Sequence, residues 1–202
     1  MRRVPALAAA TAAAVAVLAS ASPARADGES TAPGAGESAP PVQNRINFRI
    51  GGASSDDTGR PTFCLDVRVV AGLGVESCGT GQALIHNEPG REMAHFRATW
   101  TLLSTHTDRG TGKLRAGAGF AELQVGIDHV GFQFGSPDAA DHGSVSGPEA
   151  VVQGQWLVPL GRGVEAIASF TAGAAAFARA DELVIPQRAV QPFLAVEIGL
   201  GW

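Results

Sequence analysis

Apolar residues at every second position are the feature that most constrains the fold of this 202-residue chain. Successive side chains of a β-strand point to opposite sides, whereas an amphipathic helix needs apolar residues three and four positions apart. Residues 45–50, 96–102, 150–158 and 164–174 repeat the alternation, and no long segment after residue 44 carries a helical stripe. The last segment is the most regular, with one face formed by Val190, Leu194, Val196, Ile198, Leu200 and Trp202 and the other by Gln191, Ala195, Glu197, Gly199 and Gly201. The sequence therefore predicts an all-β fold.

Two N-terminal segments lie outside this pattern. Residues 1–26 combine Arg2 and Arg3, an Ala/Val/Leu run and the small-residue site Ala24-Arg25-Ala26, which is the pattern of a secretory signal peptide. Residues 27–44 are rich in Gly, Pro, Ala and Ser without apolar periodicity, and such a segment cannot bury enough surface to fold. We expect a signal peptide over 1–26, a disordered tether over 27–44 and one β-barrel domain over 45–202.

Cys64 and Cys78 decide whether the segment between them is predicted as one strand or as a hairpin. An exported protein normally oxidises such a pair, but in one continuous strand the two residues would lie more than about 40 Å apart. A hairpin that turns at residues 70–72 places Cys64 opposite Cys78. We predict this hairpin and a disulfide, with unpaired thiols as the alternative.

With this hairpin the chain contains about eight strands. In the fifth, the apolar pattern changes phase after Phe120, where Ala121, Leu123 and Val125 take over the apolar face; a bulge or a short loop at 126–131 would correct the phase. Long connections alternate with shorter ones, which is typical of outer-membrane barrels. The predicted strands are 45–53, 63–69, 73–78, 94–104, 113–134, 148–158, 164–177 and 189–202.

Over residues 45–202 the chain resembles the small eight-stranded outer-membrane barrels of Gram-negative bacteria, and is similar to the transmembrane domain of outer-membrane protein A. The resemblance implies an antiparallel up-and-down barrel with long loops on one side. It also implies a monomer that contacts outer-membrane lipid and the barrel insertion machinery. In that class the terminal strand carries the insertion signal, here formed by Leu194, Val196, Ile198, Leu200 and Trp202.

The polar strand faces carry six bases and six acids, which could pair inside a narrow barrel. Burying unpaired charges is prohibitive, so this balance favours a lumen filled with ion-paired side chains and without an open pore. The predicted lumen network is Arg45, Arg49, Asp66, Arg68, Glu76, Arg97, Lys113, Arg115, Glu122, Glu149, Glu165 and Glu197.

Alternation alone does not decide which face meets lipid. A soluble barrel or sandwich has the same period with its apolar face inside. A soluble periplasmic or secreted β-protein that binds an apolar ligand is therefore the main alternative.

The sequence contains few signs of chemistry. The five histidines lack zinc-ligand spacing, and neither a G-x-S-x-G elbow nor a phosphate loop is present. Asp138, Asp141 and His142 could hold a cation, although a solvated acidic loop is the simpler interpretation. The net charge of −4 argues against nucleic-acid binding. We expect a structural or loop-mediated role with no catalytic residues, no cofactor and no metal.

A lipid hydrolase of the outer membrane is the remaining alternative. Its candidate groups are His95 with Ser104 or Thr99, or His86 and Glu88 with Asp181. A nucleophile and its base must lie within hydrogen-bonding distance, which only a structure can show.

Overall fold

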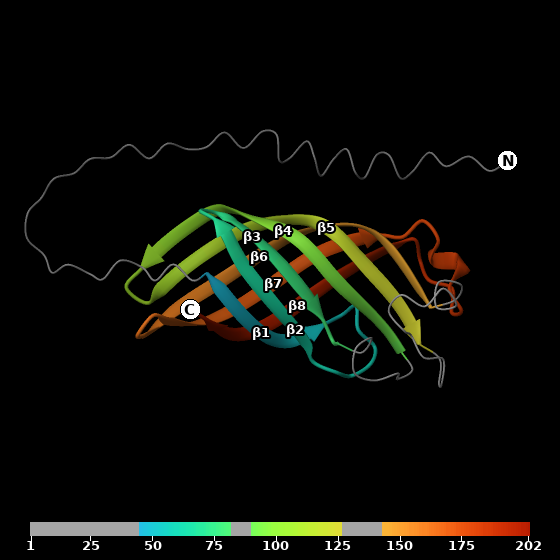
Figure 1. Cartoon of the computed structure of the whole chain (residues 1–202), viewed down its shortest axis with the longest axis horizontal. Helices are drawn as coiled ribbons and strands as arrows, with labels where there is room; N and C mark the ends of the chain where they lie inside the picture. Colours follow the sequence, from blue (N-terminus) through green and yellow to red (C-terminus); the bar gives the residue numbers. More distant parts are fainter. Residues whose placement is uncertain (1–44, 82–89, 127–142) are drawn as a thin grey trace, which may run out of the picture. The chain divides into compact units, whose positions relative to one another are not determined.

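Eight antiparallel strands form a single closed barrel in the computed structural model, which describes residues 45–81, 90–126 and 143–202 (Figure 1). Each strand pairs with its neighbours in the chain, and β1 pairs with β8 to close the ring. The prediction of an all-β barrel is confirmed. The strands are β1 (Ile46–Ala53), β2 (Thr62–Val70), β3 (Leu73–Gly79), β4 (Gly90–Thr107), β5 (Gly110–Gly126), β6 (Ser144–Gly161), β7 (Val164–Ala176) and β8 (Val190–Gly201).

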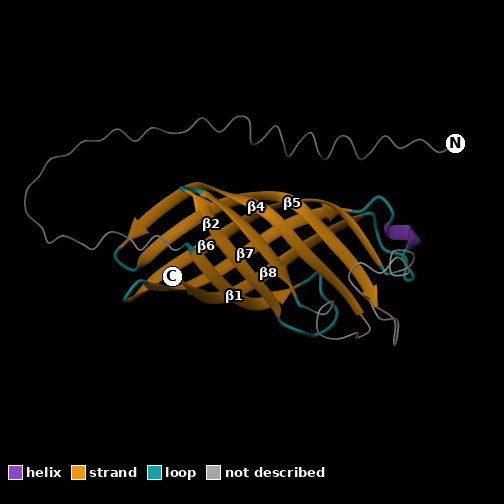
Figure 2. Ribbon diagram, viewed as in Figure 1, coloured by secondary structure: helices purple, strands orange, loops and turns teal. Residues whose placement is uncertain are grey.

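The two ends of the barrel differ in their connections (Figure 2). At one end, here called the turn end, two residues separate β2 from β3, β4 from β5, and β6 from β7. Gly72 in the first of these turns has a φ of 78°, a backbone conformation that two-residue hairpins require and glycine adopts without strain. At the other end, the loop end, the connections are longer, and the one before β8 contains a short 3₁₀ turn, Ala180–Glu182. Within the described part of the chain, no helix is long and apolar enough to cross a membrane.

The strand register sets the tilt of the barrel wall. One series of paired residues runs through all eight strands: Asn47, Asp66, Glu76, Arg97, Gly119, Glu149, Ala175 and Gln191. The series ends on β8, which pairs with β1 through Ala195 and Ala53. Gln191 lies four residues before Ala195, so in this antiparallel register it is level with position 57. The series therefore returns to the first strand ten residues beyond Asn47, where it began. Such a stagger requires strands inclined to the barrel axis, typically by about 35–45°.

The two faces of the wall have opposite character. On β8, Gln191, Phe193, Ala195 and Glu197 are buried, while the residues between them are exposed. The same alternation on the other strands leaves most large apolar side chains on the outside and most charged ones inside. The apolar face is therefore the outer face, which the sequence pattern had left open.

β5 does not change phase within the described residues, and the bulge or short loop predicted at 126–131 lies, apart from Gly126, outside them. β5 pairs with β6 in continuous register from Thr111 to Gln124, and Ala121, Leu123 and Val125 are buried inside the barrel. The register shift lies instead in β4, between Thr101 and Leu103. The interior itself changes along its axis from charged to apolar, so the strand keeps its phase while its residue types change.

Pro192 in β8 occupies a position where its missing N–H is not needed. The amide of Leu194, two residues on, donates to the Ser54 hydroxyl beyond the end of β1. The backbone nitrogen of Pro192 faces the same side, but β1 already ends at Ala53. A proline is tolerated where the adjacent strand offers no acceptor.

The Cys64–Cys78 disulfide joins directly paired positions of β2 and β3 inside the barrel. It closes a chain segment with a sequence separation of 14, and cross-linking such a segment restricts the unfolded chain by about 3 kcal/mol. We expect the double variant Cys64→Ser, Cys78→Ser to lose about this free energy of unfolding in urea, followed by tryptophan fluorescence. Wild-type protein unfolded under reducing conditions is the control and should match the variant. Equal stability of the variant and the oxidised protein would contradict the prediction.

Candidate functional site

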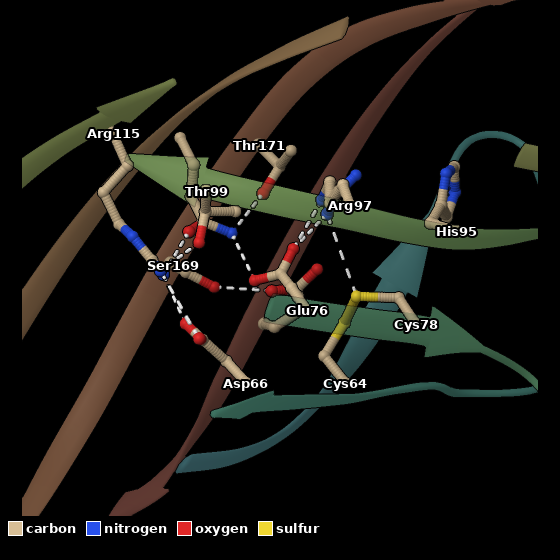
Figure 3. A network of polar contacts seen from close by, with 12 residues as sticks. Cys64, Asp66, Glu76, Cys78, His95, Arg97, Thr99, Arg115, Ser169 and Thr171 are labelled. Carbon is tan, nitrogen blue, oxygen red and sulfur yellow. Dashed lines mark hydrogen bonds and ion pairs between the residues drawn. A yellow bond between two sulfur atoms is a disulfide. The ribbon is translucent and has the colours of Figure 1, made fainter. Parts of the chain in front are cut away.

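The centre of the barrel is filled by a network of ion pairs around Glu76 of β3 (Figure 3). Glu76 is fully buried and accepts from two guanidinium groups, those of Arg49 and Arg97. Its Oε2 also accepts from Gln153 Nε2 at 3.0 Å. Two cations on one carboxylate would leave an excess of positive charge, and further acids compensate for it.

Arg49 of β1 connects Glu76 to the neighbouring strands. It is also fully buried, and its Nε lies 3.2 Å from Glu197 on β8. Its Nη1 lies 3.8 Å from Asp66 on β2. Ser169 of β7 donates to Glu197 at 2.6 Å. One arginine thus contacts acids from three strands, which stabilises the wall on both sides of the closure.

Towards the turn end, Arg115 of β5 forms a second group of contacts. It pairs with Asp66 and donates to the Thr99 hydroxyl. It also donates to the Gln153 carbonyl at 3.0 Å. Gln153 therefore bridges the Arg115 and Glu76 groups, because its amide nitrogen faces Glu76 while its oxygen faces Arg115.

Towards the loop end, Arg97 reaches Glu149 of β6 at 3.6 Å, and Glu149 contacts His95 Nδ1 at 2.7 Å. The His95 ring lies 4.5 Å from the ring of Phe193, centre to centre. His95 marks the border at which the charged interior gives way to an apolar one.

An apolar cluster occupies the loop-end half of the interior. The segment between β7 and β8 folds inward and contributes Phe177, Ala180 and Leu183, all buried. They pack with residues of five strands: Met93, Ala121, Leu123, Val125, Val151, Ala175 and Phe193. The barrel is thus filled by side chains at its centre and covered by its own chain at the loop end.

The segment between β1 and β2 also closes over this end. The Asp57 amide donates to the Arg91 carbonyl of β4 at 2.8 Å. Asp56 accepts from the Met93 amide at 3.0 Å and from the Thr62 hydroxyl at 2.8 Å. Burial raises the pKa of the Asp56 carboxyl above its usual value, and these two hydrogen bonds oppose the rise.

Most of the predicted lumen residues lie inside the barrel. Arg49, Asp66, Glu76, Arg97, Arg115, Glu149 and Glu197 form the ion-paired centre. Glu165 is buried, Arg68 and Lys113 line a cavity near the turn end, and Arg45 is exposed just before β1.

Glu122 is the exception, and its placement in the lumen network is wrong. It lies between Ala121 and Leu123, both fully buried inside the barrel, so its side chain is on the outer face. The assumed change of phase in β5 had assigned it to the interior.

Several neutral partners were missed because only charges were considered. Thr99, Gln153, Ser169 and Thr171 stand on the polar strand faces and complete the network. The same alternation that places the charged residues on the inner face also places these four residues there.

The hydrolase candidates are not brought together where the structure describes them. His95 contacts Glu149, and Thr99 accepts from Arg115. Ser104 lies nine residues from His95 along β4, about 30 Å away. His86, Glu88, Asp138, Asp141 and His142 lie outside the described residues.

A metal site is also unsupported at the one place where potential ligands converge in the described residues. Cys64, Cys78 and Glu197 approach one another, but the two sulfur atoms are bonded together and do not offer thiolates.

Comparison with known proteins gives no family assignment: no family model, curated protein or solved structure matches the chain.

Removing the shared carboxylate should destabilise the barrel strongly. Glu76→Ala leaves Arg49 and Arg97 buried without their common partner, a loss of about 3–5 kcal/mol in the free energy of unfolding. Urea unfolding measures it, and the matched control is Glu122→Ala on the outer face, for which we expect a change of no more than about 0.5 kcal/mol. Equal losses in the two variants would show that the inner carboxylate has no special role.

The Asp56 carboxyl should make the free energy of unfolding depend on pH. Because its pKa is raised in the folded state, the fold binds more protons than the unfolded chain between the ordinary and the raised pKa. Its contribution to stability therefore falls as pH increases through that interval. Asp56→Asn should remove this decline while its amide oxygen still accepts from Met93. Urea unfolding of both proteins from about pH 4 to 7 tests this; parallel curves would refute it.

Proposed function

We propose that this chain is an outer-membrane β-barrel protein that crosses the membrane with its eight strands and has a structural or loop-mediated role. The observation that carries the proposal is the orientation of the wall: large apolar side chains face outward while ion-paired charges are buried inside. A water-soluble barrel buries its apolar face, so this orientation is the one that a lipid environment favours.

The apolar outer surface continues around the ring. Every strand contributes at least one large apolar residue that is 37–65 % exposed: Phe48, Leu65, Val75, Phe96, Phe120, Val152, Phe170 and Ile198. Soluble monomers rarely expose a contiguous apolar patch of more than a few hundred Å². Closure of the ring also pairs the strand edges, which is a requirement for a sheet in lipid.

The dimensions of the wall suit a bilayer. β8 has 12 residues, which extend about 40 Å along the strand and about 30 Å along the axis at a usual barrel tilt. A bilayer core is about 30 Å thick. Trp100, Trp156 and Trp202 are 41–54 % exposed on the outer face, in the half of the barrel nearer the turn end, as expected of an interfacial aromatic belt.

The filled interior favours a role without transport. The central ion pairs and the apolar cluster occupy the lumen, so we expect neither conductance nor catalysis. The loops, which the rigid barrel holds in place, would then make the contacts with other molecules. The outward residues of β8, Leu194, Val196, Ile198 and Leu200, together with Trp202 directly after the strand, would serve as the insertion signal. The signal peptide expected over 1–26 agrees with export.

Fractionation of Gram-negative cells expressing the full chain tests the proposal. We expect recovery in the outer membrane and a band whose gel mobility changes on heating, because a closed barrel resists detergent until it is boiled. Recovery in the soluble periplasmic fraction without a mobility shift would overturn the membrane assignment and support the soluble alternative.

Two further measurements separate the other interpretations. Trp202→Asp should reduce the outer-membrane level if the terminal strand is the insertion signal, whereas Glu122→Gln, also on the outer wall, should leave it unchanged. Lipid hydrolysis by the purified protein that is lost in His95→Ala would support the hydrolase instead.

A further inference from the structure

The turn end of the barrel contains a cavity that the central network does not fill. Its volume is about 210 Å³, and its wall includes Arg68, Lys113, Ser104, His106, Thr111 and Glu165. A narrower hollow leads from it towards Arg115 and Asp66 of the network. The cavity is therefore a recess at the mouth of a closed lumen.

Positive charge gathers at this mouth. Arg68 and Lys113 face a single acid, Glu165, across the cavity, and Arg45 lines an adjoining hollow together with Arg68. At the described centre the balance is reversed: Asp66, Glu76, Glu149 and Glu197 meet three arginines and His95. Among the described residues that line this cavity, bases therefore outnumber acids.

A bulge in β4 gives this cavity two of its side chains. The register shifts between Thr101 and Leu103, and Leu102 and Leu103 are both exposed outside. Ser104 then pairs with Lys113 and His106 with Thr111, and this register places the exposed serine and histidine side chains on the wall of the cavity. Without the extra residue the alternation would direct both to the outer surface.

Two more register shifts lie at the same end, in β2 between Arg68 and Val70 and in β6 between Pro159 and Gly161. Bulges concentrate at barrel rims and beside functional sites, where they re-aim side chains. Three register shifts at one end of the barrel favour the interpretation that this cavity is a binding site and not a packing defect.

We propose that the turn-end cavity binds a phosphate group, carried by a small solute or by a phospholipid headgroup. Guanidinium, ammonium, hydroxyl and imidazole groups are donors that phosphate oxygens accept from, and charge-assisted bonds of this kind are the strong ones. Lys113 and Arg68 supply the charge, and Ser104 and Thr111 supply hydroxyl donors. His106 Nδ1 lies 2.9 Å from the Thr111 hydroxyl and orients it. Binding of a soluble phosphate does not depend on the membrane assignment, whereas binding of a headgroup rests on the proposed function.

Calorimetry on the purified, folded full chain tests the site. The probes are inorganic phosphate, glycerol 3-phosphate, and detergent micelles doped with dimyristoyl phosphatidylglycerol. We expect saturable binding of at least one probe with one site per chain. Lys113→Gln should weaken it by about tenfold or more, and Lys113→Arg should keep most of it.

Arg109→Gln is the matched control, because Arg109 is an exposed base in the β4–β5 turn at the same end. It removes the same charge from the mouth without touching the cavity wall, so binding should stay within about twofold of wild type. Heat-dependent gel mobility checks that each variant is folded.

The outcomes separate the sources of the phosphate. Lys113-dependent binding of the soluble probes assigns the cavity to a solute, and Lys113-dependent binding of the doped micelles alone assigns it to a headgroup. Either result supports the site. Equal weakening by Lys113→Gln and Arg109→Gln, or no saturable binding of any probe to folded protein, would overturn it.

Discussion

Two buried guanidinium groups share the Glu76 carboxylate, and the arrangement of the wall depends on this contact. Removing Arg49 and Arg97 from water is tolerable only with hydrogen-bonded counter-charges. Glu76 receives both, and Glu197, Glu149 and the Gln153 amide complete the coordination. Because Glu76 and these partners come from five strands, the network fixes the register of the ring. Because the polar faces of the strands point inward, their apolar faces must point outward.

The alternation of apolar and polar residues predicted most of the fold. It located most of the strands, since a strand shows its alternation whatever surrounds it, whereas the β2–β3 hairpin was predicted from the pairing of Cys64 with Cys78. It did not show which face is inner, because Arg49 and Glu197 on a solvated face would give the same pattern. The burial of Arg49 and Glu197 within the closed ring decides it.

The errors came from treating the inner face as uniformly polar. Leu123 and Val125 suggested a change of phase, although they are interior residues beneath the loop-end cover, and Glu122 was misplaced as a result. The real bulge had a visible signal, because two consecutive leucines at 102 and 103 cannot both face outward in a regular strand. The neutral partners and the turn-end cavity depend on contacts between distant strands, which no local pattern contains.

The unequal strand lengths described above give the barrel a short side and a long side. β1 and β3 have 8 and 7 residues, whereas β4, β5 and β6 have 17 or 18 (Figure 1). At a usual tilt, β3 covers only about 18 Å along the axis. For a barrel held in a bilayer, this is a one-sided hydrophobic mismatch, which lipid relieves by thinning locally or the protein by leaning. The thinned sector beside β1–β3 would then be the side at which a neighbouring molecule meets the least ordered lipid.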